Sequence, residues 1–115
     1  MNYKIKKISE VNTDLLNQFY KFAFPSRYKT LINHWKWSYK IGHSNFEPLL
    51  LIYNSKIIGM AGLIPENLYF RGKVNEAIWF TDFYILDEYR NKGFGSILTK
   101  EWMKICPVQI TYCNE

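Results

Sequence analysis

Residues 84–98 have the sequence YILDEYRNKGFGSIL, in which an apolar run gives way to a polar loop with two glycines and then to a helical pattern. The run AIWFTDFYIL at residues 77–86 is rich in β-branched and aromatic residues, which predicts a strand. A helix is predicted to begin near Ser96, and VQITYC at residues 108–113 predicts another strand. Since a helix joins the two strands, we expect them to be parallel neighbours in one sheet.

The loop RNKGFGS at residues 90–96 lies where this helix is predicted to start. The first amides of a helix are unpaired and the helix dipole is positive there, so the position suits a phosphate group. Gly93 and Gly95 would let successive amides turn toward one anion, and Arg90 and Lys92 add positive charge. A plain tight turn before a helix is the alternative interpretation. The spacing fits neither the Walker loop nor the dinucleotide fingerprint GxGxxG.

The first part of the chain predicts one strand and two helices. Residues 3–8 alternate apolar and basic side chains, which is typical of a half-buried strand. Apolar residues at helical spacing then follow Thr13, which can cap a helix that ends at Pro25. A second helix is predicted from Tyr28, with Gly42 just past its end.

The middle of the chain predicts antiparallel strands. The segments LLLIY and KIIGMAGLI flank Asn54 and Ser55 and predict a hairpin. Residues 67–71 and 74–86 continue as long strands around a turn at Gly72 and Lys73. Together with the strand–helix–strand unit, the pattern predicts an α/β fold, with a mixed, mainly antiparallel sheet flanked by helices.

Composition limits the classes of protein to consider. A chain of 115 residues and 13.8 kDa is expected to form a single domain over residues 1–115. Its charge of +5 and pI near 9.2 favour anionic partners such as phosphates, nucleotides or nucleic acid. We expect a cytoplasmic protein, because the sequence contains neither a membrane-spanning apolar run nor a secretory signal. Cys106, Cys113, His34 and His43 lack the spacing of metal ligands, so no metal is expected.

The stretch YILDEYRNKGFGSIL resembles the cofactor-binding motif of the GNAT superfamily of acetyl-CoA-dependent N-acetyltransferases. That motif is roughly [VI]-x-x-x-x-[RQ]-x-x-G-x-[GA], and Ile85, Arg90, Gly93 and Gly95 fill it here. The expected order of a strand, two helices and three antiparallel strands is also similar to the family's layout. The resemblance implies transfer of an acetyl group from acetyl-CoA to a primary amine, with a parallel strand pair forming the cofactor cleft.

The resemblance also implies roles for the residues of the motif. Phe83, Tyr84 and Ile85 would bind the pantetheine arm of acetyl-CoA through strand backbone groups. The loop from Arg90 to Ser96 would hold the pyrophosphate, chiefly through backbone amides; these are the amides of Asn91, Lys92, Gly93, Phe94 and Gly95. A backbone N–H near Phe83 would polarise the thioester carbonyl. Chemistry would be direct attack by a positioned amine.

The attacking ammonium must lose a proton, so a carboxylate or a water chain is expected to act as base. Asp82 is the first candidate and Glu76 the second, because both lie on or beside the predicted cleft strand. Strand alternation would place Asp82 on the face opposite Phe83 unless a bulge intervenes, and a carboxylate that only pairs with a neighbour is the alternative. Tyr112 is a candidate acid or a core residue, and Asn114 matches an asparagine that the family often carries.

The chain also departs from the family's pattern. Family members continue past the strand at Val108 with a further helix and two strands, whereas the sequence ends at Glu115. Their absence would leave a sheet edge open to self-association. Acceptors consistent with the resemblance are a small amine, an amino sugar or a protein amine. Two alternatives remain, a non-catalytic acyl-CoA-binding domain and a basic nucleic-acid-binding module, although the cations are scattered and no nucleic-acid-binding motif is present.

Overall fold

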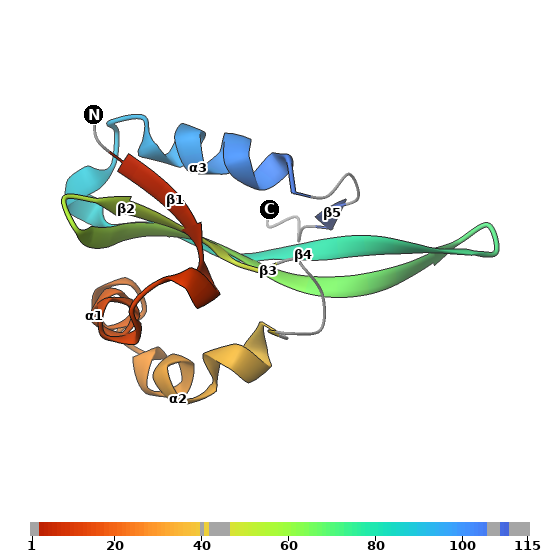
Figure 1. The fold of residues 1–115 in the computed structure, drawn as a ribbon, viewed down its shortest axis with the longest axis horizontal. Helices are drawn as coiled ribbons and strands as arrows, with labels where there is room; N and C mark the ends of the chain where they lie inside the picture. The colour runs from red at the N-terminus through yellow and green to blue at the C-terminus, as the bar shows by residue number, and fades with distance from the viewer. Residues whose placement is uncertain (1–2, 40, 42–46, 106–108, 111–115) are drawn as a thin grey trace.

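The computed structural model describes residues 3–39, 41, 47–105 and 109–110. Its sheet has the strand order β1-β2-β3-β4-β5, and every neighbouring pair is antiparallel except β4 and β5, which are parallel. The predicted α/β fold with a mainly antiparallel sheet is therefore confirmed (Figure 1). The elements are β1 (Tyr3–Lys7), η1 (Ile8–Glu10), α1 (Thr13–Ala23), α2 (Tyr28–Ser38), β2 (Leu49–Tyr53), β3 (Lys56–Phe70), β4 (Lys73–Ile85), η2 (Asp87–Tyr89), α3 (Phe94–Met103) and β5 (Gln109–Ile110).

The helices cover both faces of the sheet. Helices α1 and α2 lie on one face and α3 lies on the other (Figure 1). Each helix buries one apolar stripe, as its spacing predicts: α1 buries Leu16, Phe19, Tyr20 and Ala23, and α3 buries Phe94, Leu98 and Trp102. Between them, β2 and β3 contribute a continuous apolar layer that includes Leu50, Leu51, Ile57, Ile58, Met60 and Leu63. The loop between β4 and α3 and the loop between α1 and α2 are therefore both anchored to one core.

Helix α1 begins one residue away from the predicted cap. The Asn12 side chain accepts a hydrogen bond of 2.7 Å from the backbone N–H of Asp14, so Asn12 is the N-cap and Thr13 is the first helical residue. The prediction that Thr13 caps the helix was wrong because asparagine, one position earlier, satisfies the same unpaired amides at least as well.

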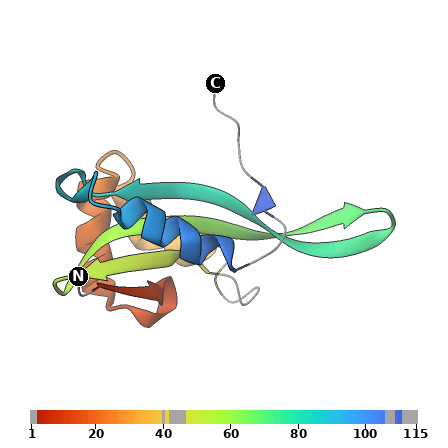
Figure 2. The same cartoon turned by 90° about the horizontal axis from the view of Figure 1, so that it is seen from above.

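Strands β3 and β4 form a long hairpin whose far end projects beyond all three helices (Figure 2). Its turn lies at Arg71 and Gly72, with φ values of +51° and +76°, and not at Gly72 and Lys73 as predicted. Both positions need the left-handed conformation that suits a tight hairpin turn. Pro65 does not interrupt β3, because the ladder with β2 ends at Ala61 and leaves β3 with one neighbouring strand at that point.

A β-bulge interrupts the ladder between β3 and β4. Met60 pairs with Tyr84 and Gly62 pairs with Thr81, so Ala61 faces both Asp82 and Phe83. Asp82 is the residue that takes up the extra length, with a φ of +51°. Gly62 leaves room for it, since a Cβ at Gly62 would lie 2.4 Å from the Thr81 carbonyl oxygen. The bulge lies next to the part of β4 that the sequence predicts to line the cleft.

The predicted parallel pair is present at the other edge of β4. Ile78 pairs with Gln109 and Trp79 pairs with Ile110. Residues 80–85 of β4 continue beyond these pairs toward the loop that starts α3. The strand, loop and helix predicted from residues 84–98 therefore lie where the sequence suggests, with α3 starting at Phe94 and not near Ser96.

Candidate active site

The loop between β4 and α3 has the geometry of an anion-binding site. Asn91 and Gly93 take left-handed conformations, with φ values of +63° and +86°, and Gly93 is the N-cap of α3. Left-handed residues that alternate with right-handed ones turn successive backbone amides toward one concave side of a loop. The amides at the start of α3 add to this group and carry the positive end of the helix dipole.

Gly95 tests whether this loop fits a bound group. A Cβ built at Gly95 meets no atom within 4 Å, and the residue lies in the first turn of α3 without a positive φ. Neither the backbone nor the packing of this chain therefore requires glycine at position 95. A ligand that lies directly against the backbone favours a small residue at this position, because a larger side chain would occupy the same space, and the motif has glycine or alanine there. The loop thus fits the pyrophosphate that the sequence motif implies.

Two side chains hold the loop in place. Phe94 is buried, with its ring centroid 5.2 Å from that of Tyr53, so its side chain anchors α3 and leaves its amide in the loop. The Arg90 guanidinium donates from Nε to the Ile85 carbonyl at 2.9 Å and pairs with Asp87 at 3.0 Å. It also lies over the Tyr84 ring. Arg90 therefore ties the loop to the end of β4, while half of its side chain stays exposed.

The structure brings most of the predicted cofactor-binding residues together around one cavity. Its volume is about 370 Å³, and its lining consists of Phe83, Tyr84, Ile85, Arg90, Asn91 and Gly95. Lys92, Gly93 and Ser96 are exposed residues of the adjoining loop and helix start. The cavity thus joins residues 83–85 of β4 to the loop that starts α3, which is the route that the predicted pantetheine and pyrophosphate sites require.

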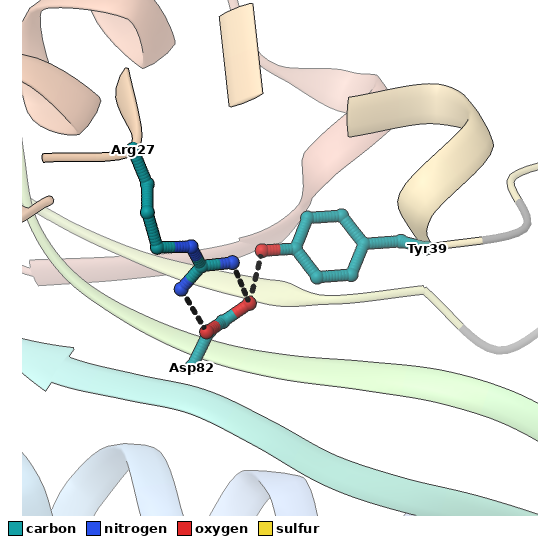
Figure 3. A network of polar contacts seen from close by, with 3 residues as sticks. All are labelled: Arg27, Tyr39 and Asp82. Atoms are coloured by element: carbon teal, nitrogen blue, oxygen red, sulfur yellow. Dashed lines mark hydrogen bonds and ion pairs between the residues drawn. The ribbon is translucent and has the colours of Figure 1, made fainter. Parts of the chain in front are cut away.

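Asp82 lies on the opposite face of the sheet from the side chains that pack under α3. The Phe83 ring contacts Phe80, whose ring centroid lies 4.2 Å from that of Trp102 on α3. The Asp82 carboxylate instead points toward α1 and α2 (Figure 3). Asp82 and Phe83 therefore lie on opposite faces of the sheet, as strand alternation predicts, although a bulge lies at this point.

Arg27 and Tyr39 bind this carboxylate. Asp82 accepts from Arg27 Nη1 at 2.8 Å and Nη2 at 3.4 Å, and from the Tyr39 hydroxyl at 2.7 Å (Figure 3). The hydrogen bond to Asp82 raises the pKa of the Arg27 guanidinium, so this cation stays charged. Burial, strengthened by the negative charge of Asp82, raises the pKa of the Tyr39 and Tyr20 hydroxyls well above the ordinary tyrosine value. Both tyrosines are therefore neutral near neutral pH, and Tyr39 donates its hydroxyl proton to Asp82.

Comparison with known proteins identifies the family. The model of the acetyltransferase (GNAT) family matches residues 10–112. The chain belongs to the GNAT family of acetyltransferases. The predicted GNAT class of acyltransferase is thereby confirmed, and the family implies acyl transfer from acetyl-CoA. No curated protein sequence matches the chain significantly.

Solved structures share the GNAT fold at low sequence identity. A GNAT family acetyltransferase from Staphylococcus aureus is 24% identical, with a TM-score of 0.76, and the match covers 100% of this chain and 89% of that one. Glucosamine-6-phosphate N-acetyltransferase from Arabidopsis thaliana is 14% identical, with a TM-score of 0.73 and coverage of 99% and 84%. The aminoglycoside N-acetyltransferase AAC(6')-Iy, solved in complex with CoA, is 13% identical, with a TM-score of 0.71 and coverage of 98% and 78%.

The second predicted base of this GNAT domain lies apart from the first. The backbone of Glu76 pairs with Asn67 in the projecting part of the hairpin. At about 3.3 Å per residue, it lies roughly 20 Å along β4 from Asp82. The structure therefore does not bring Glu76 together with Asp82 and the cavity. Tyr112 and Asn114 lie outside the described residues.

The network of Arg27, Tyr39 and Asp82 was only partly predictable. Tyr39 is buried, but its hydroxyl contact with Asp82 was not predicted from the sequence, and Arg27 was missed altogether. The sequence feature that could have indicated Arg27 is a basic residue just after Pro25, where the first helix is predicted to end. Its partner Asp82 lies 55 positions away in the sequence. In the part of the chain that the structure describes, no helix is long and apolar enough to cross a membrane, and no three His, Cys, Asp or Glu residues form a metal-binding group.

Proposed function

We propose that this GNAT domain is an acetyl-CoA-dependent N-acetyltransferase that transfers the acetyl group to a primary amine by direct attack on the thioester. The observation that carries the proposal is the loop of residues 91–95, in which Asn91 and Gly93 are left-handed and the space beside Gly95 is open for a bound group. This loop opens into the cavity that residues 83–85 of β4 also line. A loop that takes a phosphate and a strand that takes an extended arm are what a CoA thioester needs.

The cofactor residues divide into two groups. The amides of Asn91 to Ser96 hold the pyrophosphate, and the exposed cations Arg90 and Lys92 add to the positive potential. The backbone of Phe83 to Ile85 holds the pantetheine arm. When bound, acetyl-CoA supplies the acetyl group as a thioester. The CoA complex of AAC(6')-Iy, which has the same fold, supports this assignment.

Different parts of β4 have different roles in the proposed reaction. A backbone N–H near Phe83 polarises the thioester carbonyl from the edge of the strand. Asp82, on the face that α1 and α2 cover, takes the proton that the attacking ammonium must lose. Arg27 and Tyr39 hold the carboxylate in position. A bond then forms between the amine nitrogen and the acetyl carbon, and the C–S bond breaks with its electron pair going to sulfur. The second proton leaves the nitrogen and ends on this sulfur, which gives the amide and the CoA thiol.

The acceptor is a primary amine, which is a small molecule, an amino sugar or a protein amine. The amino-sugar phosphate in the name of the Arabidopsis enzyme and the aminoglycoside in that of AAC(6')-Iy illustrate the range of acceptors on this fold. A cytoplasmic location and self-association through a sheet edge belong to the same proposal.

A calorimetric titration with acetyl-CoA tests the cofactor site. We expect micromolar binding by the parent chain and loss of binding in Gly95→Trp, whose indole would fill the open side of the loop. Lys100→Trp is the matched control, because it adds the same ring at an exposed position of α3 beyond the loop and should bind as the parent does. Equal binding by Gly95→Trp, or none by a folded parent, would refute the site.

Turnover is then measured as release of the CoA thiol in the presence of an amine panel. Thiol release that depends on the amine supports the N-acetyltransferase. Acetyl-CoA binding with no transfer to any amine would instead identify a non-catalytic acyl-CoA-binding domain.

A further inference from the structure

The carboxylate proposed as base shares its site with a permanent positive charge. Arg27 lies between α1 and α2, and its Nη1 atom is 2.8 Å from Asp82 Oδ1. Residues 27, 39 and 82 come from the α1–α2 loop, the end of α2 and the β4 bulge, and they meet on one face of the sheet (Figure 3). An acceptor amine that approaches Asp82 from this face therefore also approaches the Arg27 guanidinium.

The backbone holds this carboxylate in a costly conformation. Asp82 has a φ of +51° inside the bulge, a left-handed conformation that residues with a Cβ seldom adopt. Strained residues of this kind gather at functional sites. The position of the Asp82 side chain thus points to a ligand on this face.

The guanidinium is fixed in place and has hydrogen-bonding capacity to spare. It lies 5.4 Å from the centroid of the Phe24 ring, and Asp82 is its hydrogen-bond partner among the residues that the structure describes. A guanidinium has five N–H donors in a planar fork that matches carboxylate and phosphate groups. Since 51% of the Arg27 side chain is exposed, donors that do not face Asp82 can reach a ligand.

Charge decides which amines suit such a site. A simple ammonium is attracted by Asp82 and repelled by Arg27, so the two effects largely cancel. A polycationic amine brings more repulsion still. An amine that also carries an anionic group satisfies both residues, with its nitrogen at Asp82 and its anion at Arg27. Sites built to bind a polar group reject analogues that lack it.

We propose that Arg27 determines the acceptor class of this enzyme, which is a primary amine that also carries a carboxylate or a phosphate. This inference rests on the proposed acetyl transfer. Arg27 acts as a specificity-determining residue that binds the anionic group, while Asp82 receives the proton.

Paired acceptors on the full chain test the proposal. Each pair differs by one anionic group: ethanolamine with phosphoethanolamine, propylamine with β-alanine, and glucosamine with its 6-phosphate. Thiol release from acetyl-CoA gives kcat and KM for each amine. We expect kcat/KM to be about tenfold or more higher for the anionic member. The carboxylate and phosphate pairs show which anion is preferred. Equal use of both members by the parent chain overturns the proposal, and this comparison does not depend on any variant.

Variants separate a binding role from a structural one. Arg27→Gln should raise KM for the anionic member about tenfold to a hundredfold while KM for its neutral partner changes little. Arg27→Lys should restore part of the preference, and Lys29→Gln, which removes a nearby exposed cation, should keep all of it. A loss of kcat for both members alike in Arg27→Gln would overturn the proposal. Absence of transfer to every amine, with acetyl-CoA still bound, would refute the catalytic function and remove this inference with it.

Discussion

Replacing Gly62 with alanine tests whether the bulge in β4 depends on the space that this glycine leaves. The new Cβ would lie 2.4 Å from the Thr81 carbonyl oxygen and 3.0 Å from the Cβ of Asp82. The first distance is about 1 Å shorter than an ordinary contact, and the atom it meets belongs to the backbone. One of the two strands must therefore shift, and the Asp82 carboxylate would move with it.

The expected loss of stability follows from two opposing effects. Overpacking in a well-packed region costs about 1–3 kcal/mol. Replacing glycine by alanine also makes the unfolded chain less flexible, which returns about 0.4–1 kcal/mol where the native backbone suits alanine. Gly62 has no positive φ, so this gain applies. The net effect should be a loss of about 1–2 kcal/mol in the free energy of unfolding.

Urea unfolding followed by tryptophan fluorescence measures this difference. With a slope of about 2 kcal/mol per molar urea, the middle of the usual range of about 1–3, the midpoint should fall by roughly 0.5–1 M. Gly59→Ala is the matched control in the same strand, because its Cβ would meet the end of the Ile85 side chain at 2.5 Å, which can rotate. It should cost less than Gly62→Ala. A Gly62→Ala variant as stable as the parent, or less damaging than Gly59→Ala, would refute the packing argument.

Three further predictions concern buried aromatic residues. Tyr20→Phe should leave the free energy of unfolding, measured in urea, unchanged or raise it by about 1 kcal/mol, because the buried Tyr20 hydroxyl has no hydrogen-bond partner among the described residues. A clear loss of stability would mean that the hydroxyl does have a partner. Phe94→Ala should lose about 3–5 kcal/mol, because the buried ring anchors the start of α3, and a loss below about 1 kcal/mol would contradict that role. The free energy of unfolding should be fully retained up to about pH 10 and fall above it. Folding raises the pKa of Tyr20 and Tyr39 above the ordinary 10.0, so the unfolded chain loses these protons first as the pH rises. Tyr39→Phe should make this fall with pH shallower, and an equally steep fall would exclude Tyr39 as a cause.

The cofactor loop was predictable because its signals are local. The apolar run that ends at Leu86, the glycines at 93 and 95 and the helical pattern after them lie next to one another in the sequence. Each feature fixes its own backbone conformation, so neighbouring residues suffice to predict a strand, a loop and a helix. In this stretch, only the first residue of the helix was predicted wrongly. Helix α3 begins earlier than predicted, because Gly93 acts as a left-handed N-cap.

The site on the other face of β4 depends on contacts between distant residues. The Arg27–Asp82 pair joins positions 55 apart, and it exists because the α1–α2 loop packs over the bulge. From the sequence, a bulge was considered only as a feature that would change the direction of the Asp82 side chain. The other sequence feature that indicated a bulge was Gly62, because a glycine inside a strand pattern often marks a bulge or a close approach of two backbones. Which strand carried the extra residue depended on the register between β3 and β4, and local sequence does not set that register.

The bulge gives β4 one residue more than its ladder with β3 requires. If Asp82 were deleted, Phe83 would face Ala61, and the pairs Gly62–Thr81 and Met60–Tyr84 would keep their partners and their faces. The proposed base is therefore the one residue in this stretch that strand pairing does not need. A lineage could shorten the strand by a single codon, keep the sheet and the cofactor loop, and lose only the carboxylate. The residues proposed to hold acetyl-CoA are therefore separate from the one proposed to activate the amine, and each can change without the other.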